Sequence, residues 1–293
     1  PNGTWRNVLT VDGYENEIEL HATLTVADDH IVLDFDGTSG LSKKGINVPL
    51  NYATAYSVFA LRCIIGPDIP NNAGSLAPFR VAAPENCILN AQHPAPVAMR
   101  HTLGQMTPDL VYGCLSQALP GQVPAEGASC MYDLPLRHVP ETVSQEGKQV
   151  ALELVFSGGT GARPVLITRR DLRPDSGGAG KTRGGLGQRI EMRSLTDEDI
   201  MVFLSVERLR KPARGRFGGQ SGAVGRIRIG EDGQDLPGKG EVRIPAGETL
   251  IFETPGGGGF GEPLDRPRKD IAHDLEEGLI SPEAARETYG FAP

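Results

Sequence analysis

The sequence predicts a mixed α/β (α+β) fold that is rich in β-structure, with glycine-rich turns and short C-terminal helices. Three observations support this prediction. Apolar and polar residues alternate in several short segments, as they do in half-buried strands. Two segments in the first half have helical periodicity and end at glycine or proline. Finally, 24 of the 38 glycines lie within residues 157–261, between further short apolar runs.

The first predicted elements are a β-hairpin and a helix. Residues 18–26 and 31–35 alternate between apolar and polar side chains on either side of a short turn. Residues 50–65 have helical periodicity, and the Gly-Pro pair that follows them ends the helix. The buried face of this helix is expected to consist of small and apolar side chains: Ala53, Ser57, Ala60, Leu61 and Ile64.

A second helix has a clearer start. Thr107 is the expected N-cap, Pro108 is the first helical residue, and the charge of Asp109 favours the helix dipole. Pro120-Gly121 ends this helix, and residues 123–148 are expected to form a loop.

Strand alternation returns in the second half of the chain. Six short strands are expected, over residues 150–156, 165–168, 190–195, 200–209, 225–229 and 249–253. Pro267 and Gly278 bound a first C-terminal helix, and Ser281 caps a second one. The sequence therefore divides into an α/β segment (1–145), a glycine-rich β segment (146–262) and a helical tail (263–293).

Composition excludes several classes of protein. The 293 residues carry a formal net charge of −8, which disfavours a general nucleic-acid binder. The apolar runs are too short to span a bilayer, and the first residues do not resemble a signal peptide, so a cytoplasmic protein is expected. A start at proline suggests that the sequence begins inside a longer protein. Four cysteines lack metal or redox spacing and are expected to be reduced and buried.

The positive charge is concentrated in one segment. Residues 163–228 hold 15 Lys and Arg against seven Asp and Glu. Such a patch can bind an anionic ligand, or it can dock against an acidic partner or an acidic part of the same protein. The second explanation is the simpler one.

Two glycine-rich motifs invite functional interpretations. Residues 175–182 almost match a phosphate-binding loop, but Asp175 replaces the first glycine, and the glycines after Lys181 do not favour the helix that such a loop requires. Residues 255–261 lack a strand–turn–helix context, so their glycines either line a pocket or thread the chain between packed layers.

Two groups of polar residues are candidates for catalysis. His93, Arg100 and His101 lie within nine residues beside a proline-stiffened segment, and we expect them to approach one another and face a cleft or a boundary between subunits. Arg100 is suited to hold an anionic group, and His101 to carry a proton near neutral pH. Asp34 and Asp36 are expected on the same face of one strand, where they could do acid–base work or form its polar face.

Several strings together resemble the hydantoinase B/5-oxoprolinase family, and the resemblance covers nearly the whole chain. The strings are Asp-Phe-Asp-Gly-Thr-Ser at 34–39, Gly-Ile-Asn at 45–47, Pro-Asn-Asn-Ala-Gly at 70–74, His-Pro-Ala-Pro-Val at 93–97 with Arg-His at 100–101, Ser-Gly-Gly-Thr-Gly-Ala-Arg-Pro at 157–164, the glycine strings at 175–187, and residues 255–263 with the tail that follows.

This resemblance implies a B-type subunit that pairs with an actin-like, ATP-binding A-type subunit in a hetero-oligomer. Together they would hydrolyse a small cyclic amide, such as a hydantoin, 5-oxoproline or a lactam, with ATP and Mg²⁺ on the partner subunit. Related α-type subunits belong to biotin-independent, ATP-dependent acetone and acetophenone carboxylases, so a ketone carboxylase is an alternative. A non-catalytic interaction module is a third possibility.

Two departures from the family pattern affect where the chemistry is expected. Family members are roughly twice as long, and their N-terminal half carries the His/Asp strings that bind a divalent metal. A metal site is therefore expected in that half and not in these residues. In addition, Pro164 is followed at once by Val165, where the family has an Asp-Gly loop, so a segment is expected to be absent there. The site candidates in these residues are His93, Arg100, His101 and Asp36.

Overall fold

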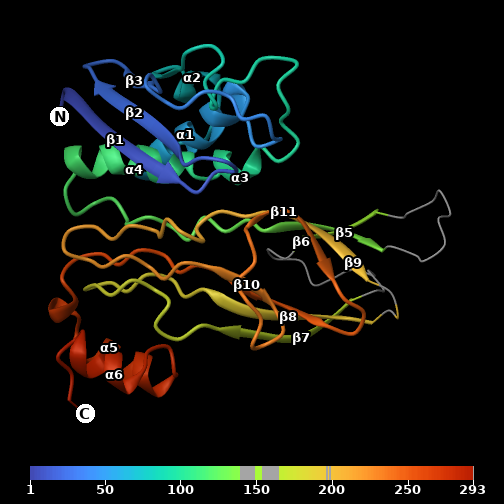
Figure 1. Ribbon diagram of the computed structural model, residues 1–293. Coiled ribbons are helices and arrows are strands. Elements are labelled where there is room, and N and C mark those ends of the chain that lie inside the picture. Colours follow the sequence, from blue (N-terminus) through green and yellow to red (C-terminus); the bar gives the residue numbers. More distant parts are fainter. Residues whose placement is uncertain (139–148, 154–164, 196, 198, 293) are drawn as a thin grey trace. The chain divides into compact units, whose positions relative to one another are not determined.

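A computed structural model describes residues 1–138, 149–153, 165–195, 197 and 199–292. The chain forms two compact units, Pro1–Glu126 and Gly127–Pro293, and each is described by itself (Figure 1). The mixed α/β prediction is confirmed. The three-segment division of the sequence at residues 145 and 262 stays a prediction, and the family string at 157–164 and its junction with Val165 lie outside the described residues.

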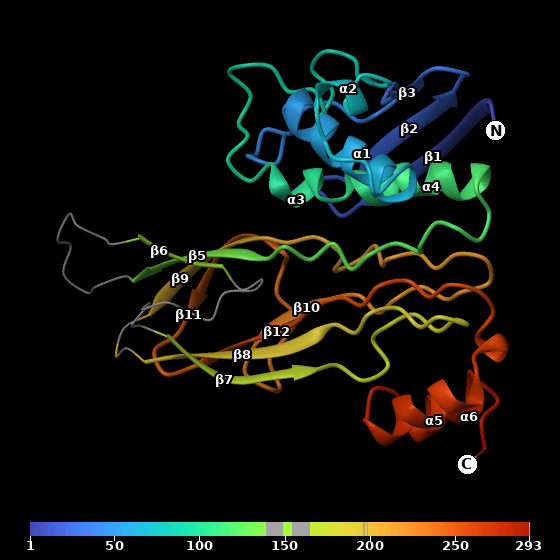
Figure 2. The same ribbon diagram turned by 180° about the vertical axis from the view of Figure 1, so that it is seen from behind.

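The first unit is a four-stranded sheet with helices on one face. The strands have the order β1 (Gly3–Val11), β2 (Ile18–Val26), β3 (Ile31–Asp34) and β4 (Phe79–Ala82), with only the last pair parallel. The helices are α1 (Leu50–Ile64), α2 (Ala73–Leu76), α3 (His101–Gly104) and α4 (Thr107–Ala118). Helix α4 packs on β1 and β2, and α1 packs beside α4, as both views show (Figures 1 and 2).

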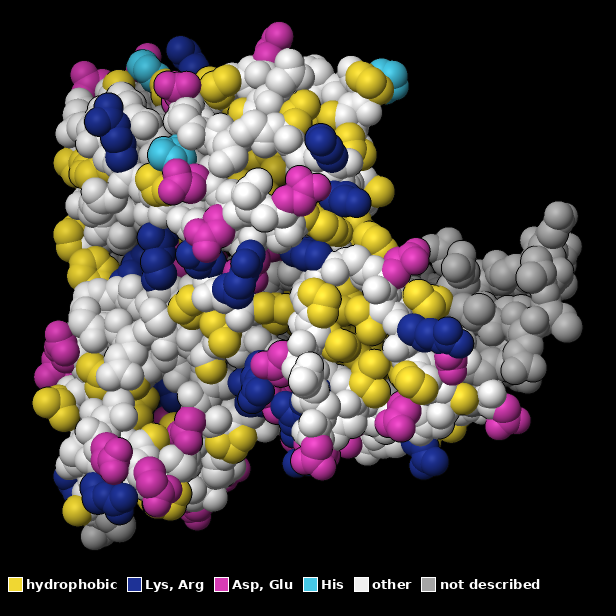
Figure 3. Space-filling view, in the orientation of Figure 1, with side chains coloured by type: hydrophobic (Ala, Val, Ile, Leu, Met, Phe, Trp, Pro, Cys, Tyr) yellow, Lys and Arg dark blue, Asp and Glu magenta, His cyan; other side chains and the backbone are white. Residues whose placement is uncertain are grey.

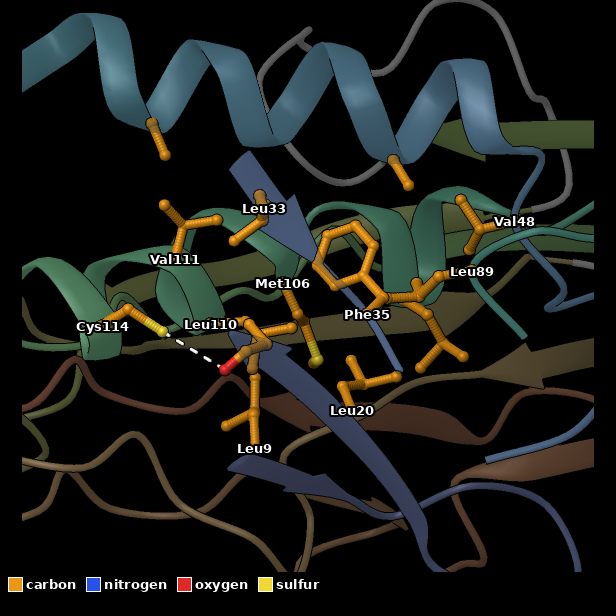
Figure 4. Close-up of a cluster of buried hydrophobic side chains, with 14 of the residues drawn as sticks. Leu9, Leu20, Leu33, Phe35, Val48, Leu89, Met106, Leu110, Val111 and Cys114 are labelled. Atoms are coloured by element: carbon orange, nitrogen blue, oxygen red, sulfur yellow. Dashed lines mark hydrogen bonds between the residues drawn. The ribbon is translucent and has the colours of Figure 1, made fainter. Parts of the chain in front are cut away.

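The core of this unit follows the alternation of β2. Leu20 and Leu24 are fully buried in the core of this unit, as is Phe35, which directly follows β3. Figure 4 shows Leu20 and Phe35 in this apolar cluster. Each such side chain contributes about 1.5–3 kcal/mol when it is fully buried. The Cys114 thiol lies 3.5 Å from the Ala22 carbonyl oxygen and fixes α4 to β2.

Two strands of this sheet were not predicted. In β1 the alternation of apolar and polar residue types is broken. Val8 faces solvent, whereas the Asn7 side chain turns inward and donates from Nδ2 to the Leu110 carbonyl at 2.9 Å. Strand β4 has only four residues and no buried side chain. Its pairing with β3, far away in sequence, therefore determines its conformation.

The start of α4 corrects a predicted cap. Thr107 is already helical, and Met106 is the N-cap with helical backbone angles. Helix α3 runs almost directly into α4, so the Thr107 hydroxyl donates back to the Gly104 carbonyl at 2.8 Å instead of accepting from the new helix.

The described strands of the second unit form two antiparallel sheets. One has the order β10 (Arg226–Ile229), β12 (Thr249–Glu253), β8 (Gln188–Ser194) and β7 (Val165–Leu172). The other has the order β11 (Lys239–Ile244), β9 (Ile200–Ser205), β5 (Asp133–His138) and β6 (Gln149–Glu153). Apolar residues from both sheets form a shared core that includes Met192, Val202, Leu204, Leu250 and Phe252, so the two sheets make a β-sandwich.

The sandwich differs from the sequence prediction at two strands. Strand β5 lies in a segment predicted as loop; Pro135 inside it argued against a strand, yet it pairs with Ala151 of β6. Strand β11 was not predicted, because Gly240 interrupts it and only Val242 and Ile244 alternate inward. Residues 139–148 and 154–156, which also carried predictions, lie outside the described residues.

Three glycine-rich segments, 176–187, 213–223 and 255–261, pack side by side, and we call them the glycine lattice (Figures 1 and 2). Backbone hydrogen bonds join them: Gly178 donates to Gly257 at 2.8 Å, and Gly259 donates to Gln220 at 2.8 Å. A Cβ atom on Gly258 would lie 2.1 Å from the Arg214 carbonyl oxygen, so the backbones approach more closely than any side chain allows. The glycines of 255–261 thus thread the chain between packed layers.

The C-terminal elements agree with the sequence. The 3₁₀ turn η1 (Pro263–Asp265) precedes α5 (Arg268–Glu276) and α6 (Pro282–Glu287). The Ser281 hydroxyl caps α6 by accepting from the Ala284 amide at 3.0 Å. Acidic and basic side chains are interspersed over this part of the surface (Figure 3). Arg286 and Glu283 of α6 form one exposed ion pair there.

The four cysteines are all free thiols, but two of them are not fully buried as predicted. Cys63 is exposed because it lies on the outer side of α1, and Cys130 is half-buried, whereas Cys87 and Cys114 are buried. Among the described residues, no helix is both long and apolar enough to cross a membrane.

Candidate functional site

The segment that carries His93 is held by a buried asparagine. Asn47 is fully buried, and its Nδ2 donates to the carbonyls of Ser42, Lys44 and Pro96 at 2.8–3.0 Å. Its Oδ1 accepts from the Ser42 amide at 2.7 Å. One side chain therefore fixes two family strings, residues 45–47 and 93–97, against each other.

Arg100 is the best-defined polar group at this site. It is exposed, its Nη1 donates to the Val97 carbonyl at 3.3 Å, and its guanidinium carbon lies 5.7 Å from the centre of the Tyr52 ring. Tyr52 stacks on Tyr56 with ring centres 4.9 Å apart. Burial, together with a hydrogen bond to Tyr56, raises the pKa of Tyr52, so this phenol stays neutral. The ring supports the guanidinium from one side by a cation–π contact and leaves its donors available.

The two candidate histidines have different surroundings. His93 is exposed in the loop, before a cis peptide bond to Pro94. His101 is partly buried and opens helix α3, directly after Arg100. The structure thus places Arg100 and His101 at the start of one helix and His93 on the loop that Asn47 holds. That the three side chains converge on a cleft stays a prediction.

Asp36 lies beyond the strand on which it was predicted. Strand β3 ends at Asp34, and the Asp36 amide donates to the Asp34 carboxylate at 3.0 Å, which turns the chain. The hydroxyl groups that follow in this string bond to the backbone of β2. Thr38 Oγ1 accepts from the His21 amide, and Ser39 Oγ accepts from the Glu19 amide, both at 3.0 Å. The 34–39 string therefore builds a sheet corner and leaves the Asp36 side chain exposed.

The loop that resembles a phosphate-binding loop has another role. Asp175 adopts a positive φ of 61°, and its Oδ1 accepts from the Ser281 amide at 2.8 Å. No helix begins within residues 181–195. The loop therefore lacks the helix N-terminus that cradles a phosphate, and its acidic residue binds the C-terminal tail.

The described residues do not fit a metal site. No group of three or more His, Cys, Asp or Glu side chains lies close enough together to hold an ion among them. Arginines of the basic segment also meet acids of their own unit: Arg183 reaches Asp274 at 3.1 Å, and Arg226 reaches Asp235 at 3.2 Å. This pairing supports the docking explanation of the basic segment over an anionic-ligand site.

Sequence reasoning missed residues that shape the site. Neither Tyr52 nor Tyr56 was predicted as part of the site, although two aromatic residues at i and i+4 on one face of a helix are a signal for a stacked pair. Arg62 is buried and donates to Asn71 and to the Ile65 carbonyl, which holds the 70–74 string beside α1. A basic residue on the apolar face of a predicted helix is the sequence signal for a buried arginine of this kind.

Comparison with solved structures extends these observations. The fold is similar to that of the ATP-dependent caprolactamase from Pseudomonas jessenii, with a TM-score of 0.83 and 25% identity over 100% of this chain and 57% of that one. An acetone carboxylase gives a TM-score of 0.79 at 18% identity, over 100% of this chain and 49% of the other, which shows the fold alone.

Curated relatives of similar sequence support the same comparison. The B subunit of a putative D-/L-hydantoinase from Pseudomonas sp. is 26% identical over 99% of this chain and 56% of its own length. The beta subunit of the caprolactamase from Pseudomonas jessenii is 31% identical over 71% of this chain and 42% of its own. The chain therefore spans about half the length of these relatives. The Hydantoinase B/oxoprolinase family model matches residues 1–165 and 163–263, and the chain belongs to this family.

Proposed function

We propose that this chain is part of a B-type subunit of an ATP-dependent hydrolase of cyclic amides, which works in the cytoplasm with an ATP-binding A-type subunit. One observation carries the proposal: the chain belongs to the hydantoinase B/oxoprolinase family and matches an ATP-dependent caprolactamase along its whole length. Two of the relatives are themselves named as the B or beta subunits of their enzymes, which supports a partner subunit.

The chemistry of a cyclic amide explains why such an enzyme uses ATP. An amide carbonyl is a poor electrophile, because the nitrogen lone pair stabilises it. ATP with Mg²⁺, bound on the partner subunit, supplies the phosphoryl group that makes the amide oxygen a leaving group. Water then adds to the carbonyl carbon, the C–N bond breaks as the ring nitrogen takes up a proton, and a second water hydrolyses the resulting acyl phosphate to release phosphate and the open-chain acid.

Residues of this chain would bind and orient the reactants. Arg100 presents an exposed guanidinium that the Tyr52 ring holds in place, which suits a carboxylate or phosphate oxygen. His101 follows it in sequence and would carry a proton near neutral pH. His93 and Asp36 are exposed groups that could complete the site.

A metal and a second segment belong to the same proposal. The divalent metal would bind in the N-terminal half that longer family members have. Among the described residues, no group of three or more His, Cys, Asp or Glu side chains could hold an ion. That half, the A-type partner and this chain would then form a hetero-oligomer around the small-molecule substrate.

The alternative activity is ATP-dependent carboxylation of a ketone, the reaction of the acetone carboxylase whose fold this chain shares. Both reactions use ATP to activate an otherwise unreactive oxygen. A non-catalytic interaction module is the third possibility.

The test is to purify the complete B-type subunit with its A-type partner and measure two reactions in parallel. ATP-dependent ring opening of caprolactam, hydantoin or 5-oxoproline supports the proposal. Bicarbonate-dependent consumption of a ketone instead establishes the carboxylase. Ring opening that survives substitution of His93, Arg100, His101 and Asp36 together assigns the chemistry to other parts of the complex.

A further inference from the structure

The glycine lattice has almost no apolar core of its own. The core of the β-sandwich includes none of its residues. A separate cluster joins Ala179 of the lattice to the C-terminal tail through Ile271, Ile280, Ala285 and Tyr289. The tail therefore supplies apolar side chains to a layer that is built mainly of backbone.

A buried ion cluster joins the same two parts. The Asp274 side chain of α5 is 4% exposed and lies between two arginines. Arg183 of the lattice reaches it with Nε at 3.1 Å and Nη2 at 3.3 Å. Arg266 reaches it with Nη2 at 2.7 Å and also donates from Nη1 to the Lys181 carbonyl at 3.2 Å. Removing the carboxylate would leave two cations close together away from water.

Asp175 provides a second, independent contact. Its carboxylate accepts from the Ser281 amide, and its own amide donates to the Leu279 carbonyl at 3.2 Å. Both partners lie in the turn between α5 and α6. The tail is thus held to the lattice both at α5 and at the turn that leads into α6.

We propose that residues 263–292 are a strap that holds the glycine lattice in its packed form, so that releasing the strap loosens the lattice and leaves the β-sandwich folded. The physical reason is that glycine loses more conformational entropy than any other residue when its backbone is fixed. Backbone hydrogen bonds each contribute only about 1 kcal/mol net, and the lattice lacks the apolar burial that offsets this entropy elsewhere. The family match ends at residue 263, so residues 264–292 of the strap lie beyond the matched residues.

The test is hydrogen exchange on the full chain carrying Asp274→Asn. This substitution keeps the shape of the side chain and removes the charge between the two arginines. The amides of Gly178, Gly257 and Gly259 report the lattice, and those of β9 and β11 report the sandwich. We expect the lattice amides to exchange at least tenfold faster in the variant, with sandwich amides unchanged.

Glu276→Gln is the matched control, because it removes a carboxylate from an exposed position on the same helix. It should change no exchange rate by more than twofold. Asp175→Gly is the second variant: glycine accepts the positive φ, so the variant removes the side-chain contact with Ser281 without straining the backbone, and the lattice should again loosen selectively. Lattice exchange that stays unchanged in both Asp variants overturns the proposal. Equal loss of protection in lattice and sandwich also overturns it, since the tail would then support the whole unit.

Discussion

Arg100 is the residue whose substitution tests the candidate site most directly. Arg100→Ala removes a guanidinium held over Tyr52, and we expect kcat/KM of the assembled enzyme to fall roughly ten- to hundredfold, the effect of losing about 1.5–3 kcal/mol of charged hydrogen bonding. Arg100→Lys should recover only part of this, because an ammonium group lacks the planar fork. Arg80→Ala, which removes another exposed arginine of the same unit, is the control. Equal activity of Arg100→Ala and Arg80→Ala would remove Arg100 from the site.

Substitution of Lys181 is a test in which we expect no effect. We expect Lys181→Ala to leave the ATP affinity of the complex unchanged, because the preceding Asp175 binds the Ser281 amide and no helix follows the lysine within residues 181–195. The measurement is a nucleotide titration of the assembled complex. A tenfold weaker affinity, about 1.4 kcal/mol, would show that the loop contacts nucleotide after all.

At the scale of elements, Asn47 decides how two loops are held. Its amide makes four hydrogen bonds in a fully buried position, so Asn47→Ala leaves several backbone groups of both loops without their partner. We expect a loss of about 2–3 kcal/mol in the free energy of unfolding. Asn51→Ala, at an exposed position of α1, should change it by less than about 0.5 kcal/mol. Urea unfolding of both variants, each assembled with the complete subunit and its partner, would show whether the difference exists.

The glycine lattice allows a comparison between two of its own positions. A Cβ at Gly258 would overlap the Arg214 carbonyl oxygen, whereas one at Gly185 meets nothing within 4 Å. We expect Gly258→Ala to cost about 3 kcal/mol or more, or to prevent folding. Gly185→Ala should be neutral or stabilising by about 0.5 kcal/mol, because it restricts the unfolded chain. Similar melting temperatures for the two variants would contradict the close packing described above.

The same elements show how far the sequence alone reaches. Strand β2 and helix α1 were predicted nearly to the residue, because one face of each is apolar and the alternation is unbroken. Strands β1, β4 and β5 were missed because their conformation depends on partners: Asn7 turns inward to bond with α4, and Pro135 is tolerated in β5. At the candidate site, the sequence identified Arg100 but not the Tyr52 ring that supports it, since that contact joins residues 48 positions apart. The close approach of glycine backbones in the lattice leaves no sequence pattern apart from a high glycine content.

For the whole molecule, the glycine content argues against independent stability. The 38 glycines among the 293 residues offer no side chain to bury, and fixing them costs additional conformational entropy. We expect these residues, expressed alone, to associate or to unfold without a sharp transition, and to gain stability from interfaces well above about 1,000 Å². The measurements are mass in solution and a thermal scan. A monomer that unfolds cooperatively above about 50 °C would contradict this expectation.

The close packing of the lattice has a consequence for evolution. Every missense change at a glycine codon adds at least a Cβ atom, so positions such as Gly178 and Gly258 reject every other residue type on steric grounds alone. Purifying selection would therefore keep these glycines invariant in lineages that differ in substrate or even in reaction. If these glycines are invariant in an alignment, the cause would be the backbone packing of the fold and not a shared activity. We expect the residues that distinguish one activity from another to lie at exposed positions, where side chains of many kinds can be accommodated.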